Sequence, residues 1–238
     1  MRVAAPMRRA TARVYNRALS ATERVLPFLP MRRCPCCGWT GLRFRMIAFV
    51  EYMRGDARCP ACGSLERHRA LSYFYPSFFR SLARAPGRTI HFAPEQSLVS
   101  SIKPFCGAYQ TSSYPTQGFA DLNLDLSKLD LPDESCDLLV MNHVLNCVPD
   151  DRPVIREMVR VLTRGGSVLV TTGLKEGRTF EHPRASNQTY RDYGIDDLAS
   201  RFSPFDVRRV QAADDLDARA RRLHGIPEAV PVLILTKS

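Results

Sequence analysis

Long apolar runs are missing from this 238-residue sequence. None approaches the roughly 20 consecutive apolar residues that a membrane-spanning helix needs. The first 30 residues also lack the continuous apolar stretch of a secretory signal, which predicts a cytoplasmic protein. Structural disulfides are correspondingly not expected.

Lysine is scarce as well, with four residues against 30 arginines. Because arginine also stands at sites that look freely exposed, this bias reads as a compositional preference and carries no inference about binding. The other totals, 45% hydrophobic and 24% charged residues, are typical of a globular protein. A chain of this length can hold one ordinary domain and a small one.

Acidic residues are nearly missing from the N-terminal arm, residues 1–33, which has eight arginines and one acid. The arm therefore carries about +7 of the chain's net charge of +10. Its residues 10–26 match an amphipathic helix with one apolar face, Val14, Ala18, Ala21 and Val25, and one basic face, Arg13, Arg17 and Arg24. We predict peripheral contact with anionic lipid or nucleic acid through this arm. A solvated tail, or a helix packed on the body, fits the same pattern.

Cysteine, by contrast, is plentiful, and four of the eight form two identical knuckles, CPCCG at 34–38 and CPACG at 59–63. Each C-x-x-C turn offers two sulfurs from one tight loop, and the glycine behind it lets the backbone turn back. Two disulfides or a redox pair would use the same residues, and Cys36 has the wrong spacing for a ligand. We predict a closed, structural Zn²⁺ site formed by Cys34, Cys37, Cys59 and Cys62.

The segment between the knuckles, LRFRMIAFVEYM, is strand-like and predicts the hairpin of a zinc ribbon. Its aromatic residues Phe44, Phe49 and Tyr52 are expected in the core of the ribbon. A helical segment follows, with an expected bend at Pro76. The predicted division is a basic arm at 1–33 that can form a helix, the ribbon at 34–63, a helical connector at 64–87 and a larger domain at 88–238.

Strand and helix patterns alternate through the larger domain. Strands are predicted at 89–93, 109–113, 122–126, 136–145, 167–172 after a turn at Gly165–Gly166, 205–210 and 230–237, and helices at 96–105, 150–162 and 195–202. This alternation favours an α/β fold, a Rossmann-like seven-stranded and mostly parallel sheet with helices on both faces. A ligand would lie beyond the carboxyl ends of the first, second and fourth strands.

The stretch LDLPDESCDLLVMNHVLNCVPDDRPVIREMVRVLTRGGSVLVTT resembles the central block of class I S-adenosylmethionine-dependent methyltransferases of type 11. The resemblance spans roughly 88–237 and is strongest over 125–172. The CPACGSLERHRAL, IHFAPE and RDYG segments are similar to a bacterial subgroup of that family with an N-terminal zinc ribbon. The resemblance implies methyl transfer with S-adenosyl-L-methionine as cofactor, beside the structural Zn²⁺.

The expected cofactor loop lacks glycine, since none lies between Gly87 and Gly107. By position, His91 stands where the family has an acid, and Ala93 and Glu95 stand where it has glycines. The resemblance implies that these three residues meet the methionine end, with the small Ala93 permitting close approach and Glu95 pairing with the ammonium group. The alternative is a lost site in which Glu95 is a solvated acid at a helix start.

Further cofactor contacts are implied after the other strands. Ser113, between Ser112 and Tyr114, replaces the acid that usually binds the ribose hydroxyls. Asp125 and Leu126 match the pair that reads adenine, although Asp125 also suits a turn or cap. Asn142 and His143 would face cofactor and acceptor, with His143 as the candidate catalytic base. A lone histidine is more often structural.

The segment 173–194 would cover the acceptor, with polar candidates Glu181, His182, Arg184, Arg191 and Tyr193, and 65–69 would approach from the ribbon side. Gln188 and Thr189 stand where the subgroup often has an Asp-His pair, so no acceptor assignment carries over. We expect a small-molecule acceptor rather than RNA, because the ribbon hairpin is more apolar than a base-stacking platform. The alternatives are an RNA-binding or RNA-modifying protein and a non-catalytic pseudo-methyltransferase scaffold.

Overall fold

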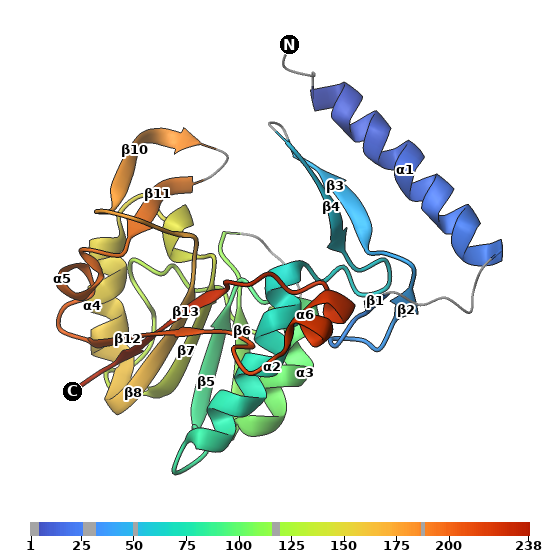
Figure 1. Cartoon of the computed structure of the whole chain (residues 1–238). Helices are drawn as coiled ribbons and strands as arrows, with labels where there is room; N and C mark the ends of the chain where they lie inside the picture. Colours follow the sequence, from blue (N-terminus) through green and yellow to red (C-terminus); the bar gives the residue numbers. More distant parts are fainter. Residues whose placement is uncertain (1–4, 26–31, 50–51, 116–119, 187–188) are drawn as a thin grey trace. The chain divides into compact units, whose positions relative to one another are not determined.

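The computed structural model describes the chain except residues 1–4, 26–31, 50–51, 116–119 and 187–188, drawn as a grey trace in Figure 1. It forms two compact units. The ribbon unit comprises Met1–Ser77, Gln96–Ser101 and Ala213–Glu228, and the sheet unit comprises Phe78–Glu95, Ile102–Ala212 and Ala229–Ser238. These units are interleaved along the sequence, whereas the predicted division at residues 33, 63 and 87 is linear.

The ribbon unit contains a long helix and two short antiparallel hairpins. Its elements are α1 (Ala5–Val25), β1 (Arg32–Arg33), β2 (Thr40–Gly41), β3 (Arg45–Ala48), β4 (Met53–Arg58), the first part of α2 (Glu66–Ser81) and α6 (Ala218–His224). The predicted hairpin between the knuckles is confirmed as β3 and β4. Phe44 is buried as expected, but Phe49 and Tyr52 are exposed near the hairpin tip, so their assignment to the core is wrong.

Arg69 lies at the centre of the ribbon unit and is fully buried. Its guanidinium donates to the carbonyl oxygens of Ala57 (2.8 Å), His224 (2.6 Å) and Gly225 (2.9 Å) and lies 3.8 Å from the centre of the Phe44 ring. Burial lowers the pKa of Arg69, and the carbonyl oxygens replace the water that the buried cation has lost. The side chain thus joins the hairpin, α2 and the C-terminal insertion of the ribbon unit.

The sheet unit is built on six strands in the order β12-β13-β8-β7-β5-β6. They are β5 (Arg88–Phe92), β6 (Ala108–Ser112), β7 (Cys136–Asn142), β8 (Leu162–Thr171), β12 (Asp206–Gln211) and β13 (Pro231–Thr236). The pairs among β6, β5, β7 and β8 are parallel, while β13 is antiparallel to both β12 and β8. The mostly parallel, Rossmann-like sheet is therefore confirmed.

The sheet has six strands where seven were predicted. The expected strand at 122–126 is reduced to one parallel bridge between Leu122 and Ser112. Two residues later, the amide of Leu124 donates to the side-chain hydroxyl of Ser112 (3.2 Å). This bond replaces the backbone hydrogen bond that would continue the strand pairing, so the pairing ends there.

Two expected helices are shorter than predicted. The segment 96–105 divides into 3₁₀ turns at Gln96–Leu98 and Lys103–Phe105 around the single α-turn α3 (Val99–Ile102), with Pro104 starting the second 3₁₀ turn. Only Leu198–Arg201 (α5) is helical within 195–202. A small extra sheet, β9 (Leu174–Lys175), β10 (Phe180–Ser186) and β11 (Thr189–Gly194), was not predicted.

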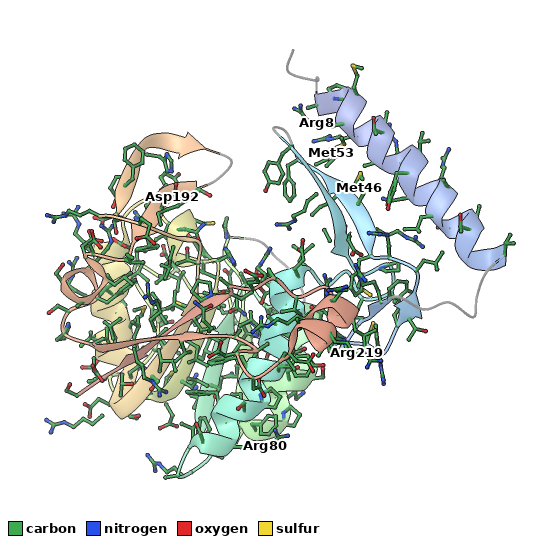
Figure 2. All side chains as sticks on the ribbon, viewed as in Figure 1. Arg8, Met46, Met53, Arg80, Asp192 and Arg219 are labelled. Atoms are coloured by element: carbon green, nitrogen blue, oxygen red, sulfur yellow. The ribbon has the colours of Figure 1, made fainter. Side chains whose placement is uncertain are left out.

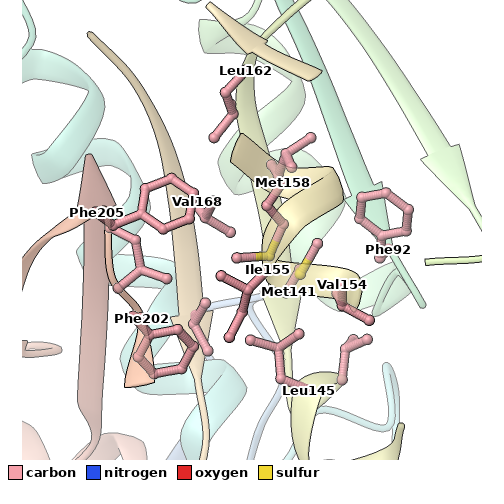
Figure 3. Packing of buried hydrophobic residues seen from close by; sticks show 14 of the residues in the cluster. Phe92, Met141, Leu145, Val154, Ile155, Met158, Leu162, Val168, Phe202 and Phe205 are labelled. Atoms are coloured by element: carbon pink, nitrogen blue, oxygen red, sulfur yellow. The ribbon is translucent and has the colours of Figure 1, made fainter. Parts of the chain in front are cut away.

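The core of the sheet unit forms where α4 (Asp151–Val161) packs on the sheet. Figure 3 shows Val154, Ile155 and Met158 of this helix facing apolar side chains of the sheet such as Met141 and Val168. The predicted helix at 150–162 is confirmed, and Asp150 caps it by accepting a hydrogen bond from the amide of Arg152 (3.0 Å). Among the described helices, none is both long and apolar enough to cross a bilayer.

Candidate functional site

A pocket of about 750 Å³ lies at the carboxyl edge of the parallel strands. We call it the strand-end pocket. Because β5, β6 and β7 run parallel, the residues that follow them meet at one edge, as the sequence predicted. The pocket is lined by four of the predicted cofactor or catalytic residues, Ala93, Asp125, Leu126 and His143.

Two residues of the pocket lining have positive φ angles, Ala93 (+46°) and His143 (+53°). Each directly follows a strand, and each amide still bonds across the sheet, to the carbonyl oxygens of Ser112 and Thr171 respectively (both 2.8 Å). The left-handed conformation at Ala93 is the one that glycine adopts without cost. Ala93 therefore occupies a glycine position in conformation as well as in sequence.

A buried polar network lies behind Ala93. One carboxylate oxygen of Glu95 accepts from the side-chain amide of Asn142 (3.0 Å) and contacts Nε2 of His91 (3.3 Å). The other ring nitrogen of His91 bonds the hydroxyl of Tyr109 (2.9 Å), and Asn142 accepts from Thr171 (3.1 Å). His91 and Asn142 are almost fully buried, so both hold Glu95 from within the sheet.

Asp125 and Leu126 lie side by side on the pocket wall. The carboxylate of Asp125 accepts from the amide (2.8 Å) and the hydroxyl (2.7 Å) of Ser127. These bonds, the side-chain one first, lower the pKa of Asp125 and keep it charged at neutral pH. The turn that was the alternative reading for Asp125 is thus present, together with its place in the pocket.

The end of β6 gives the two serines different positions. Ser112 is buried and lines the pocket, whereas Ser113 is half-buried and is not among the lining residues; Tyr114, on its other side, is. The sequence reasoning did not single out Cys147 and Asp150, which line the pocket from the loop after β7. The signal was available, because both belong to the VLNCVPD loop of the family-like block. Hydrogen bonds from Arg152 lower the pKa of Asp150 to about 2.

A second cavity, of about 730 Å³, shares Pro149 and Asp150 with the strand-end pocket. We call it the hairpin cavity, because Glu181, His182 and Arg191 of β10 and β11 line it. Three predicted acceptor candidates, Glu181, His182 and Arg191, thus line a cavity, while the side chain of Arg184 lies outside the described residues.

Arg191 and Tyr193 act mainly as supports. Arg191 is buried and donates to the carbonyl oxygens of Leu145 (2.7 Å), Val148 (2.9 Å) and Pro149 (2.8 Å). The Tyr193 hydroxyl donates to the buried carboxylate of Asp151 (2.7 Å). Burial raises the pKa of Tyr193. Both side chains therefore fix the loop between the two cavities, and Arg191 also belongs to the lining of the hairpin cavity.

The four predicted zinc ligands come together in the ribbon unit, with all sulfurs within 4.8 Å of one another. The Cys34–Cys62 and Cys37–Cys59 sulfur distances are both 3.7 Å. Zinc–sulfur bonds of about 2.3 Å in a tetrahedron require roughly 3.8 Å between sulfurs. The arrangement therefore fits zinc in size as well as in ligand type.

The backbone around the cysteines repeats in both knuckles. The amides of Gly38 and Gly63 bond the carbonyls of Cys34 (2.8 Å) and Cys59 (3.0 Å), and both glycines have the positive φ that the turn demands. Cys36 instead directs its sulfur to the carbonyl of His68 (3.8 Å) and is not part of the cluster.

Comparison with known proteins gives one family match and many similar folds. Residues 100–170 match the model of a family described as a methyltransferase domain. A solved protein of Pyrococcus horikoshii is 8% identical, with a TM-score of 0.50, covering 75% of this chain and 94% of that one. A structure described as a SAM-dependent methyltransferase of Leishmania major is 10% identical, with a TM-score of 0.50, covering 71% and 72%. No curated protein matches the chain.

The domain match and the strand order agree on one class. The match covers the segment from α3 to β8, which contains the loop after β7, and the antiparallel β13 lies between β8 and β12. The matched residues thus form part of a methyltransferase domain, and the sheet unit has a fold similar to that of a solved SAM-dependent methyltransferase.

Proposed function

We propose that the strand-end pocket holds S-adenosylmethionine between Ala93 on one side and Asp125 and Leu126 on another. The volume of about 750 Å³ and the charged, ordered carboxylate of Asp125 support this assignment. Asp125 would accept from the adenine amine while Leu126 packs on the ring. The cofactor supplies a methyl group that its sulfonium activates toward nucleophiles.

Glu95 would hold the methionine end of the cofactor. The contacts from His91 and Asn142 fix its carboxylate, and the side chain is only 16% exposed, which favours a specific cationic partner such as an ammonium group. In this proposal His91 and Asn142 position Glu95, and Ser113 serves the ribose by one hydroxyl only.

The acceptor would be a small polar molecule in the hairpin cavity. The shared wall of Pro149 and Asp150 would bring an acceptor within reach of the first pocket, which suits an in-line transfer that depends on positioning. Where the attacking atom must lose a proton, His143 in the pocket lining would accept it as the methyl carbon leaves sulfur.

Zinc would have a structural role in the ribbon unit. Four thiolates close its coordination sphere, which leaves no position for a substrate. The size and repeated geometry of the cysteine cluster support the proposal.

Calorimetric titration with S-adenosylmethionine tests the cofactor assignment. Asp125→Ala should weaken binding by roughly tenfold, because a charge-assisted hydrogen bond contributes about 1.5–3 kcal/mol. The matched control is Asp130→Ala, at an exposed acid of the same segment, which should bind like the unaltered protein. Equal affinities of the two variants, or no saturable binding at all, would contradict the assignment.

The acceptor class is tested by cofactor turnover with separate metabolite and RNA fractions of the source organism. We expect turnover with the metabolite fraction. Turnover that needs the RNA fraction and is destroyed by ribonuclease would establish the alternative.

A further inference from the structure

The net charge of the protein is concentrated in its first 77 residues. This segment contains 14 arginines and four acids, so it carries +10, and the rest of the chain is neutral. Residues 1–77 are also the main part of the ribbon unit. The excess charge therefore belongs to the ribbon unit. The two pockets proposed for methyl transfer are lined by residues of the sheet unit.

Helix α1 packs on the ribbon hairpin along one face. Ala12 is buried there, and the side-chain amide of Asn16 makes two bonds to the backbone of Met46 in β3 (2.8 and 2.9 Å). This pair satisfies the edge of β3 much as a neighbouring strand would. In Figure 2, Arg8 lies on the side of α1 that faces Met46 and Met53 of the hairpin.

Another face of α1 is apolar and points to solvent. Met7, Val14 and Val25 are 62%, 68% and 75% exposed. Residues seven and eleven positions apart share one face of a helix with 3.6 residues per turn, and Ala18 and Ala21 fall on the same line. We call this row the apolar stripe. Exposing these apolar side chains to water costs free energy, and such a row is typical of a surface that binds a partner or a membrane.

An arginine pocket adjoins the apolar stripe. The cavity, of about 970 Å³ between α1 and the second knuckle, is lined by Arg17, Arg45 and Arg58, and Ala21 of the stripe belongs to its wall. Among the described residues its lining contains no acid. The nearby acids have other partners, since Asp56 pairs with Arg32 and Glu66 with Arg54. Such a pocket suits phosphate groups.

The hairpin tip adds exposed aromatic and apolar side chains, Phe49, Tyr52 and Met53. The rings of Phe49 and Tyr52 stack on each other at 4.7 Å, and Arg54 lies 5.5 Å from the Phe49 ring centre. Aromatic side chains near basic ones are typical of a bilayer interface and occur in base-stacking sites as well, so the hairpin tip fits either polyanion.

We propose that the ribbon unit docks on the surface of an anionic phospholipid bilayer. The apolar stripe of α1 enters the boundary between headgroups and acyl chains, and the arginine pocket receives lipid phosphates. RNA would neutralise the arginines equally well, but it would leave Met7, Val14 and Val25 in water. The apolar stripe therefore decides between the two polyanions.

Co-sedimentation of the full chain with vesicles tests the proposal. We expect binding to equimolar phosphatidylcholine and phosphatidylglycerol vesicles, and little binding to phosphatidylcholine alone. Val14→Asp should weaken binding roughly tenfold, the effect of losing one buried valine side chain. Val14→Leu should bind at least as well as the unaltered protein. Position 14 is solvent-exposed in the free protein, so cofactor binding should be the same in the unaltered protein and in both variants.

Charge is tested separately with Arg17→Glu, which should weaken binding to the anionic vesicles by more than the roughly fivefold expected for one basic residue. Arg156→Glu, the same change on the exposed side of α4, is the matched control and should have no effect. The proposal would be overturned if neither Val14→Asp nor Arg17→Glu changed the affinity for anionic vesicles. So would an absence of vesicle binding combined with tight, salt-sensitive binding to single-stranded RNA that Val14→Asp leaves unchanged.

Discussion

At the scale of single residues, Glu95 is the position where this chain departs furthest from a glycine-rich loop. Its carboxylate is held by two buried side chains, His91 and Asn142, which reach it from two neighbouring strands. A carboxylate held in this way needs no rearrangement to meet a cation. The loop therefore has a fixed carboxylate at a position where a glycine-rich loop would have a flexible backbone.

The role of Glu95 predicts a selective defect. Glu95→Gln preserves the shape and the bond from Asn142 but removes the charge, so affinity for S-adenosylmethionine should fall about tenfold or more. Affinity for adenosine, which has no methionine end, should stay the same. Calorimetry with both ligands measures the contrast. A parallel loss for adenosine would indicate a general structural defect, and no loss for either would indicate a solvated acid.

Single residues also show what the sequence could predict of the site. Ala93, Asp125 and His143 could be found, because each follows a recognisable strand or matches a local motif. The bond between Glu95 and Asn142 joins positions 47 residues apart, and no local pattern encodes it. The supporting bonds of Arg191 could not be predicted for the same reason, since its carbonyl partners lie more than 40 positions away.

At the scale of elements, α4 is tied to the preceding loop by Arg160. Its guanidinium pairs with Glu157 (2.8 Å) and Asp133 (2.7 Å) and donates to the carbonyl oxygens of Leu129 and Leu131 (both 2.8 Å). The bond from Arg160 lowers the pKa of Glu157. The helix is thereby fixed to the loop through a charged carboxylate.

This pair predicts how stability changes in acid. Because the pKa of Glu157 is lower in the folded than in the unfolded chain, its contribution is complete above the unfolded value of about 4.3 and disappears as pH falls through the folded value. Glu157→Gln should therefore reduce the free energy of unfolding at neutral pH and make its decline below about pH 5 less steep. Urea unfolding at several pH values measures this. The exposed control Glu176→Gln should leave the curve unchanged, and a Glu157→Gln curve parallel to it would refute the coupling.

The last residue of β11, Gly194, allows a close contact between backbones. A Cβ atom there would overlap the backbone of Gly177 and Arg178. Gly194→Ala should lower the free energy of unfolding by about 1–3 kcal/mol through overpacking. Gly173→Ala is the matched control, because the space around it is open. Equal thermal stability of the two variants would show that β11 can shift without cost.

Elements differ in how well local sequence specifies them. The strands β5, β7 and β8 and the capped helix α4 have strong hydrophobic patterns, and all were predicted. The strand at 122–126 failed because the hydroxyl of Ser112 takes a ladder bond, which is a tertiary effect. The small sheet of β9, β10 and β11 escaped prediction because β9 has two residues and β10 and β11 are largely polar.

At the scale of the whole molecule, the cysteine cluster predicts dependence on zinc. The purified protein should contain one zinc per chain, and a strong chelator should lower its unfolding temperature, because metal binding contributes to folding. Cys37→Ser should lose the metal, while Cys36→Ser, one position away, should retain it. Metal analysis with differential scanning calorimetry measures both effects. Retention of zinc by Cys37→Ser would exclude the proposed ligand set.

The bonds between Arg69 and the C-terminal insertion set an order for biosynthesis. The residues that they join are 155 and 156 positions apart. A ribosome must therefore deliver nearly the entire chain before the guanidinium can reach the carbonyl oxygens of His224 and Gly225. N-terminal parts of a protein usually fold first during synthesis, but the ribbon unit cannot be completed in that order. A nascent chain that stalls before residue 213 lacks the carbonyl oxygens that complete the ribbon unit around Arg69.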